Sequence, residues 1–220
     1  MMAFDPSPVV NKPDGKLPPE AMRLMADAQR RLSTVLKARK VAQRACISLV
    51  FMGVLTGMFA VVGGQGPSWS GLVMGVWMTV AGIVEFIGAQ GTAKLKPKAL
   101  TMLAVNQLLL GLMFAGFGAW WMLALKMGWN TADVKSAQQF MGSVSNSLVT
   151  VGDAGASTGR INSIAYTAVY WGYGSLVVFG LLVDAPMALY YFYRRRQLEA
   201  YLRETPEWIV QMHSITSGAV

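Results

Sequence analysis

The sequence is poor in the side chains that build most catalytic and metal sites. Its 220 residues include one cysteine, Cys46, and one histidine, His213. A single cysteine excludes an internal disulfide and a cysteine metal cluster, and a lone histidine disfavours histidine-ligated metals and histidine acid–base catalysis. The HExxH, GxSxG and Walker-loop motifs are also absent from the sequence. We therefore expect that the chain is not an enzyme and has no catalytic residues, metal or cofactor.

Charge is scarce as well. Only 14% of the residues are charged, against about a quarter in a typical soluble domain. Hydrophobic residues make up 54% of the chain, and the mean hydropathy is +0.41. This balance predicts an integral membrane protein. The net charge of +8 then indicates contact with anionic membrane lipid, and we expect no nucleic acid partner.

Four apolar runs predict the fold class, an all-α membrane protein built as a four-transmembrane-helix bundle. The shortest run has eighteen residues and covers ~27 Å at the ~1.5 Å rise of a helix, just enough to cross a hydrocarbon core. Loops rich in glycine, proline or lysine separate the runs. We place the spans at about 45–62, 70–89, 99–125 and 164–190 within a membrane domain of residues 45–193.

The segments before the first span predict a tail and a helix. Residues 1–18 contain four prolines and few large apolar side chains, which is typical of disorder. Residues 19–44 predict a basic amphipathic cytoplasmic helix, which either binds a membrane surface or partner or simply extends the first span. Its apolar stripe has spacings of four and three residues and consists of Ala21, Met25, Ala28, Leu32 and Val35.

Two further segments flank the last span. The loop 126–163 contains a second amphipathic pattern at 134–151, which predicts a helix that lies on the membrane or binds a partner. After the last span, residues 194–220 form a basic cytoplasmic tail. A short polar helix is expected to continue to Thr205, where Pro206 stops it, and the last dozen residues are expected to be frayed.

The distribution of lysine and arginine predicts the orientation. Nine of these residues lie in the first 44 positions, three in the turn Lys94–Lys98 and four after Tyr193. Only Lys126, Lys135 and Arg160 lie on the other side of the predicted spans. Because basic residues accumulate on the cytoplasmic side, both termini are expected to be cytoplasmic, in the inner or plasma membrane of the cell.

Four polar side chains interrupt the apolar spans: Glu85, Asn106, Gln107 and Asp184. Counted along each span, they lie at a similar depth near the cytoplasmic end, and we predict that they form one intramembrane polar layer. Polar groups are costly inside a membrane, so they usually hydrogen-bond to one another or mark an ion site. Pro186 slightly favours an ion site, because it frees the carbonyl of Leu182 near Asp184.

Small and basic residues supply the remaining candidate contacts. GxxxG spacing places small residues on one helix face and permits close helix packing; it occurs at Gly53 and Gly57 and again at Gly71 and Gly75. Basic residues beside the spans are expected to contact anionic lipid. They are Lys94, Lys96, Lys98, Arg194, Arg195 and Arg196.

These patterns support two functional hypotheses. The first is a non-catalytic assembly, accessory or scaffold subunit, which forms a homo-oligomer or joins a hetero-oligomeric membrane complex through helix–helix contacts. The second is a small ion- or proton-conducting channel or transporter that uses the predicted polar layer. The sequence shows no internal repeat of the kind found in many transporters, which favours the first hypothesis.

Overall fold

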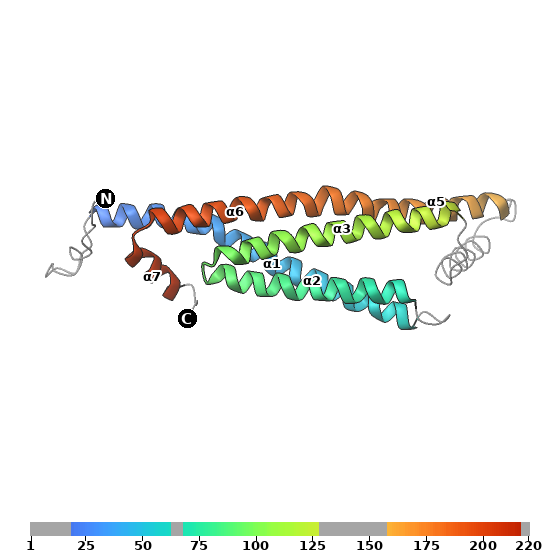
Figure 1. The fold of residues 1–220 in the computed structure, drawn as a ribbon, viewed down its shortest axis with the longest axis horizontal. Coiled ribbons are helices and arrows are strands. Elements are labelled where there is room, and N and C mark those ends of the chain that lie inside the picture. Colours follow the sequence, from blue (N-terminus) through green and yellow to red (C-terminus); the bar gives the residue numbers. More distant parts are fainter. Residues whose placement is uncertain (1–18, 63–67, 128–157, 217–220) are drawn as a thin grey trace. The chain divides into compact units, whose positions relative to one another are not determined.

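The computed structural model describes residues 19–62, 68–127 and 158–216 (Figure 1), and no β-strand occurs among them. Short connections apart, these residues are helical. The elements are α1 (Pro19–Val62), α2 (Trp69–Ala93), α3 (Pro97–Met127), α5 (Thr158–Phe179), the π-helical turn η2 (Gly180–Asp184), α6 (Ala185–Glu204) and α7 (Glu207–Thr216).

The all-helical, four-span prediction is confirmed. Within the described residues, four helical stretches are long and apolar enough to cross a membrane: 19–62, 69–93, 97–127 and 170–204. The predicted tail at 1–18 and the predicted loop helix at 134–151 lie outside the described residues. The cytoplasmic position of both termini stays a prediction.

Helix α1 runs without a break through the predicted boundary between residues 44 and 45. No proline or glycine lies between Glu20 and Met52 to interrupt it. The predicted apolar stripe faces inward: Ala28, Leu32 and Val35 are 4%, 5% and 0% exposed. The basic segment is therefore a direct extension of the first apolar stretch, with its own buried face.

The turn between α2 and α3 depends on a left-handed residue that is not glycine. Leu95 has φ 52°, and the amides of Leu95 and Lys96 donate to the carbonyls of Thr92 and Gly91 at 3.1 Å each. This is the hydrogen-bond pattern of a Schellman motif, which usually places glycine at the left-handed position. Burial of the leucine side chain, 7% exposed, offsets part of the conformational cost.

The end of the chain differs from the sequence-based expectation. Helix α6 does end just before Pro206, but the frayed segment expected there is instead the helix α7. Ile209 on α7 is fully buried, and the Tyr201 hydroxyl lies 2.8 Å from Nδ1 of His213. Burial of the apolar α7 residues stabilises a segment too short to form a stable helix alone.

The chain divides into two compact units. Unit 1 comprises residues 1–46, 84–104 and 189–220, and unit 2 comprises residues 47–83 and 105–188. The sequence of unit 1 contains sixteen of the nineteen lysines and arginines and eight of the eleven acids, so it carries the whole net charge of +8. Unit 2 has three bases and three acids and is otherwise apolar or uncharged.

Unit 1 is held together by a core of apolar side chains. Val35, Ala38 and Ala42 of α1 are completely buried, as are Leu198 and Tyr201 of α6. At the edge of this core, the Arg31 guanidinium forms an ion pair with Glu204. Both side chains are about half exposed, and exposed ion pairs contribute little to stability. Apolar burial therefore supplies most of the stabilisation of this unit.

Unit 2 packs its helices through small residues and methionine. A cluster of Met74, Met78 and Ala81 from α2 with Leu110 and Phe114 from α3 forms one part of its core. In a second cluster, the rings of Trp121 and Tyr173 stack at a centroid distance of 5.4 Å.

Close glycine contacts join the helices of unit 2. A Cβ added to Gly53 of α1 would lie 2.5 Å from Oγ1 of Thr79 and 2.7 Å from the carbonyl oxygen of Gly75 on α2. A Cβ added to Gly57 meets nothing within 4 Å. The contact between α1 and α2 therefore needs glycine at position 53 but tolerates a methyl group at position 57.

We predict that Gly53→Ala destabilises the protein by ~1–3 kcal/mol, the usual cost of overpacking a tight contact. The matched control is Gly57→Ala, which brings the same gain in helix propensity without the clash. Thermal unfolding in a mild detergent should show a lower midpoint for Gly53→Ala only. Equal midpoints for the two variants would show that the close α1–α2 contact does not limit stability.

Candidate functional site

The first polar cluster lies in unit 1. Glu85 on α2 and Tyr191 on α6 are both completely buried, and the Tyr191 hydroxyl donates to Oε2 of Glu85 at 3.4 Å. Burying a carboxyl group is costly unless hydrogen bonds replace its lost water. The tyrosine supplies one such bond and links α2 to α6.

The second cluster lies in unit 2 and uses an amide. Asn106 on α3 is 8% exposed, and its Nδ2 donates to the backbone carbonyl of Ala81 on α2 at 3.1 Å. Its neighbour Gln107 is 3% exposed. The asparagine therefore joins two apolar helices through a hydrogen bond that lipid cannot offer, as is typical of polar residues between membrane helices.

Asp184 lies in unit 2 at the end of the π-helical turn. It is 4% exposed, and a Cβ added to Gly111 of α3 would lie 2.8 Å from the Cβ of Asp184 and 2.6 Å from the carbonyl oxygen of Gly180. Pro186 has no N–H to donate to the Leu182 carbonyl, and the wider turn precedes it directly. The aspartate is thus held where α3 and η2 approach most closely.

All four predicted polar residues are buried, as expected for side chains that face the interior. The structure connects them to different partners: Glu85 to Tyr191, Asn106 to Ala81, and Asp184 to the neighbourhood of Gly111. Glu85 belongs to unit 1 and the other three to unit 2. A single common layer therefore stays a prediction.

The predicted glycine motifs serve contacts inside the chain. Gly53 meets Gly75, as described above, and a Cβ added to Gly71 would lie 2.8 Å from the Cβ of Ala60. Gly57 also takes part, because a Cβ on Gly75 would lie 2.7 Å from its backbone nitrogen. All four glycines line the contact between α1 and α2.

The predicted lipid-contacting bases differ in their availability. Lys94, Lys96 and Lys98 are exposed around the α2–α3 turn. Arg194 instead stacks over the Tyr190 ring at 4.8 Å and donates to Gln197 at 2.7 Å, and Arg195 pairs with Glu199 at 2.7 Å. Arg196 is exposed. The lysines and Arg196 are therefore the bases best placed to meet an anionic surface.

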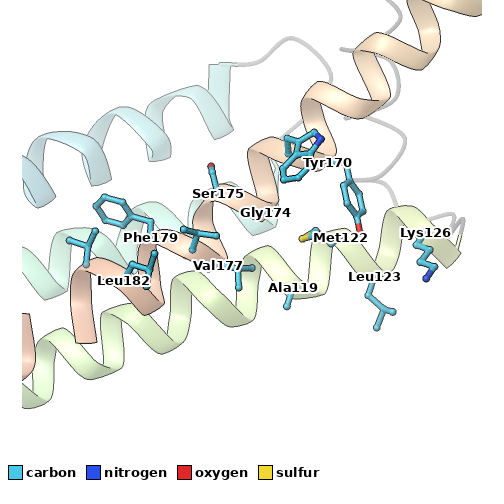
Figure 2. A pocket seen from close by; sticks show the side chains of 13 residues that line it. Ala119, Met122, Leu123, Lys126, Tyr170, Gly174, Ser175, Val177, Phe179 and Leu182 are labelled. Carbon is cyan, nitrogen blue, oxygen red and sulfur yellow. The ribbon is translucent and has the colours of Figure 1, made fainter. Parts of the chain in front are cut away.

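Sequence reasoning missed two features. It did not single out Tyr191, although its distance of seven residues from Asp184 places the two on the same helix face. It also missed an apolar groove in unit 2, of about 910 Å³, between α3 and the α5–η2 segment (Figure 2). The groove depends on which side chains of two helices stay exposed, and neither helix shows this alone.

We predict that the Glu85–Tyr191 hydrogen bond is measurable as a coupling energy. Tyr191→Phe should destabilise the protein by about 1 kcal/mol, because a buried carboxyl group loses a donor. In a double-mutant cycle with Glu85→Leu, whose side chain cannot accept the bond, unfolding free energies should depart from additivity by at least ~0.5 kcal/mol. The control, Tyr193→Phe, changes a side chain that is 59% exposed and should show additivity; a coupling of zero at Tyr191 would refute the bond.

No family model, no curated protein and no solved structure matches this chain. A function must therefore be inferred from the geometry and chemistry of its own residues.

Proposed function

We propose that the chain is a non-catalytic membrane subunit that assembles with a protein partner through its first apolar helix. The observation that supports this proposal is the poor packing of that helix within the chain. Only 11% of the most apolar window of α1 is buried, against 44% for α2 and 39% for α3. The least buried of the four apolar windows is thus also the one with the highest mean hydropathy, 2.3.

The exposed face of α1 has the pattern of a helix-packing seam. Large apolar residues recur at spacings of four and three, and all of them are at least 48% exposed: Ile47, Phe51, Val54, Met58 and Val61. Such a pattern fits a second helix that inserts its side chains between these residues. The small residues Gly53 and Ala60 lie on another face and already contact α2.

The occupant that fits this seam is another membrane helix, from a second copy or from a different subunit. In unit 1, Lys94, Lys96 and Lys98 are exposed and could make polar contacts with a partner of their own. The buried polar residues would then act as structural hydrogen-bonding groups within the subunit. This role agrees with the bonds from Tyr191 to Glu85 and from Asn106 to Ala81.

We predict that a photoreactive phenylalanine analogue at position 51 forms a crosslink to a protein in native membranes. The matched control places the analogue at Leu112, which is 71% exposed on α3 and lies outside the seam. Gel mobility and mass spectrometry of the adducts report the partner. A protein adduct at position 51 but not at 112 supports the proposal, whereas only lipid adducts at position 51 would contradict it.

The second candidate function is ion or proton conduction. The observation that favours it is the burial of two carboxyl side chains, Glu85 and Asp184, in apolar helices. Intramembrane acids often mark ion or proton pathways. Glu85 hydrogen-bonds to Tyr191, and Asp184 lies at the end of the π turn that packs against Gly111. These contacts also fit a structural role, which we favour.

We therefore expect Glu85→Gln and Asp184→Asn to leave ion and proton flux unchanged. The measurement is flux through proteoliposomes that contain the purified protein, compared with empty liposomes. Each variant keeps the shape of the side chain, so loss of folding should be small. A specific flux in the wild type that disappears in both variants would replace the assembly proposal by the conduction one.

A further inference from the structure

The groove between α3 and α5–η2 in unit 2 contains residues with a small side chain or none. A Cβ added to Gly174 would lie 3.8 Å from Sδ of Met122, which is an ordinary van der Waals distance, so the glycine faces Met122 without a tight contact. Ala119 lies across from it on α3 (Figure 2). The Ser175 hydroxyl hydrogen-bonds to the Gly172 carbonyl of its own helix at 2.6 Å. The side chains at the bottom of the groove are therefore small, and the Ser175 hydroxyl already has a hydrogen-bond acceptor.

The walls are apolar and open. Trp171 and Leu182 are 71% and 70% exposed, and Val178 and Phe179 about half exposed. From Tyr170 to Val183 the lining extends over fourteen residues of the chain, which is ~20 Å along a helix. One leaflet of a ~30 Å hydrocarbon core is ~15 Å deep. The groove is thus long enough to hold an acyl chain through the depth of a leaflet.

The two ends of the groove differ chemically. Lys126 is exposed and is the one charged side chain among the lining residues, and Tyr170 lies near it at the same end. Phe179 and Leu182 lie at the other end, as Figure 2 shows. Tyrosine, tryptophan and lysine are the side chains that typically lie at the level of lipid headgroups. Charge complementarity therefore places a phosphate at Lys126 and hydrocarbon along the rest.

We propose that this groove binds one anionic phospholipid, with an acyl chain between α3 and α5–η2 and the headgroup phosphate at Lys126. An acyl chain follows the irregular wall at the π turn, where a straight helix would leave gaps. The site is separate from the seam on α1, and it stands whether or not a protein covers that seam.

The test measures bound lipid on the purified full-length protein. The protein is reconstituted with equal amounts of phosphatidylglycerol and phosphatidylcholine, extracted in a mild detergent and examined by native mass spectrometry. We expect one retained phosphatidylglycerol per chain. Lys126→Gln should lower the preference for phosphatidylglycerol about five-fold, the effect of one lysine near an anionic headgroup.

A matched pair of glycine variants tests the acyl-chain position. Gly174→Leu fills the groove, whereas Gly116→Leu adds the same side chain on α3 at an exposed site outside it, where a Cβ meets nothing within 4 Å. Retained lipid should fall in Gly174→Leu and stay at the wild-type level in Gly116→Leu.

Three results would overturn the proposal. They are equal lipid preference in the wild type and Lys126→Gln, unchanged lipid retention in Gly174→Leu, and a dimer that Gly174→Leu abolishes and Gly116→Leu does not. The last result would assign the groove to a second copy of the chain. Lys126→Gln alters one exposed side chain, so its result does not depend on whether the groove-filling variant folds.

Discussion

Close backbone contact at glycine is the constraint on which the apolar unit depends. Between helices in lipid, burial of apolar surface gives little driving force, so stability comes from close packing and interhelical hydrogen bonds. In unit 2 the backbones of Gly53 and Gly75 meet at α1–α2, and those of Gly111 and Gly180 meet at α3–η2. The bond from Asn106 to Ala81 then adds an α2–α3 connection that hydrocarbon cannot replace. These three pairs of helices are thus joined by contacts that a larger or apolar residue would remove.

The parts of α1, α2 and α3 that belong to unit 1 are stabilised in a different way. There the exposed surfaces carry lysine and arginine, and completely buried side chains such as Val35, Leu198 and Tyr201 form the core. For a core of this kind, apolar burial is the main driving force wherever water covers the outer face. Helix α1 contributes to both units without a break, so its first half packs through a narrow buried stripe and its second half through glycine. Helix α1 therefore packs in two different ways along its length.

Much of this architecture could be predicted from the sequence, because hydropathy and small-residue spacing are local signals. The four apolar stretches, the stripe from Ala21 to Val35 and the role of Gly53 and Gly75 in helix packing all follow from such patterns. The helix α7 and the Tyr191–Glu85 bond do not, since each depends on contacts between residues apart in the chain. Leu95 is a further case: its left-handed backbone departs from the local preference for glycine, and burial of its side chain offsets part of the cost.

The unequal packing of the four apolar stretches connects the fold to the proposed function. Helix α1 has the highest hydropathy and the lowest burial of the four stretches, and since lipid alone could cover an apolar face, it is the regular spacing of its exposed residues that supports a helix partner. Helix α2 contacts two neighbours, α1 through Gly75 and α3 through Ala81. The exposed seam on α1 and the groove beside α5 are consequently two separate surfaces with different chemistry: one has a regular helical spacing, and the other has a lysine at one end and a glycine floor. Regular spacing suits the proposed helix partner, and a charged end on an irregular groove suits the proposed lipid.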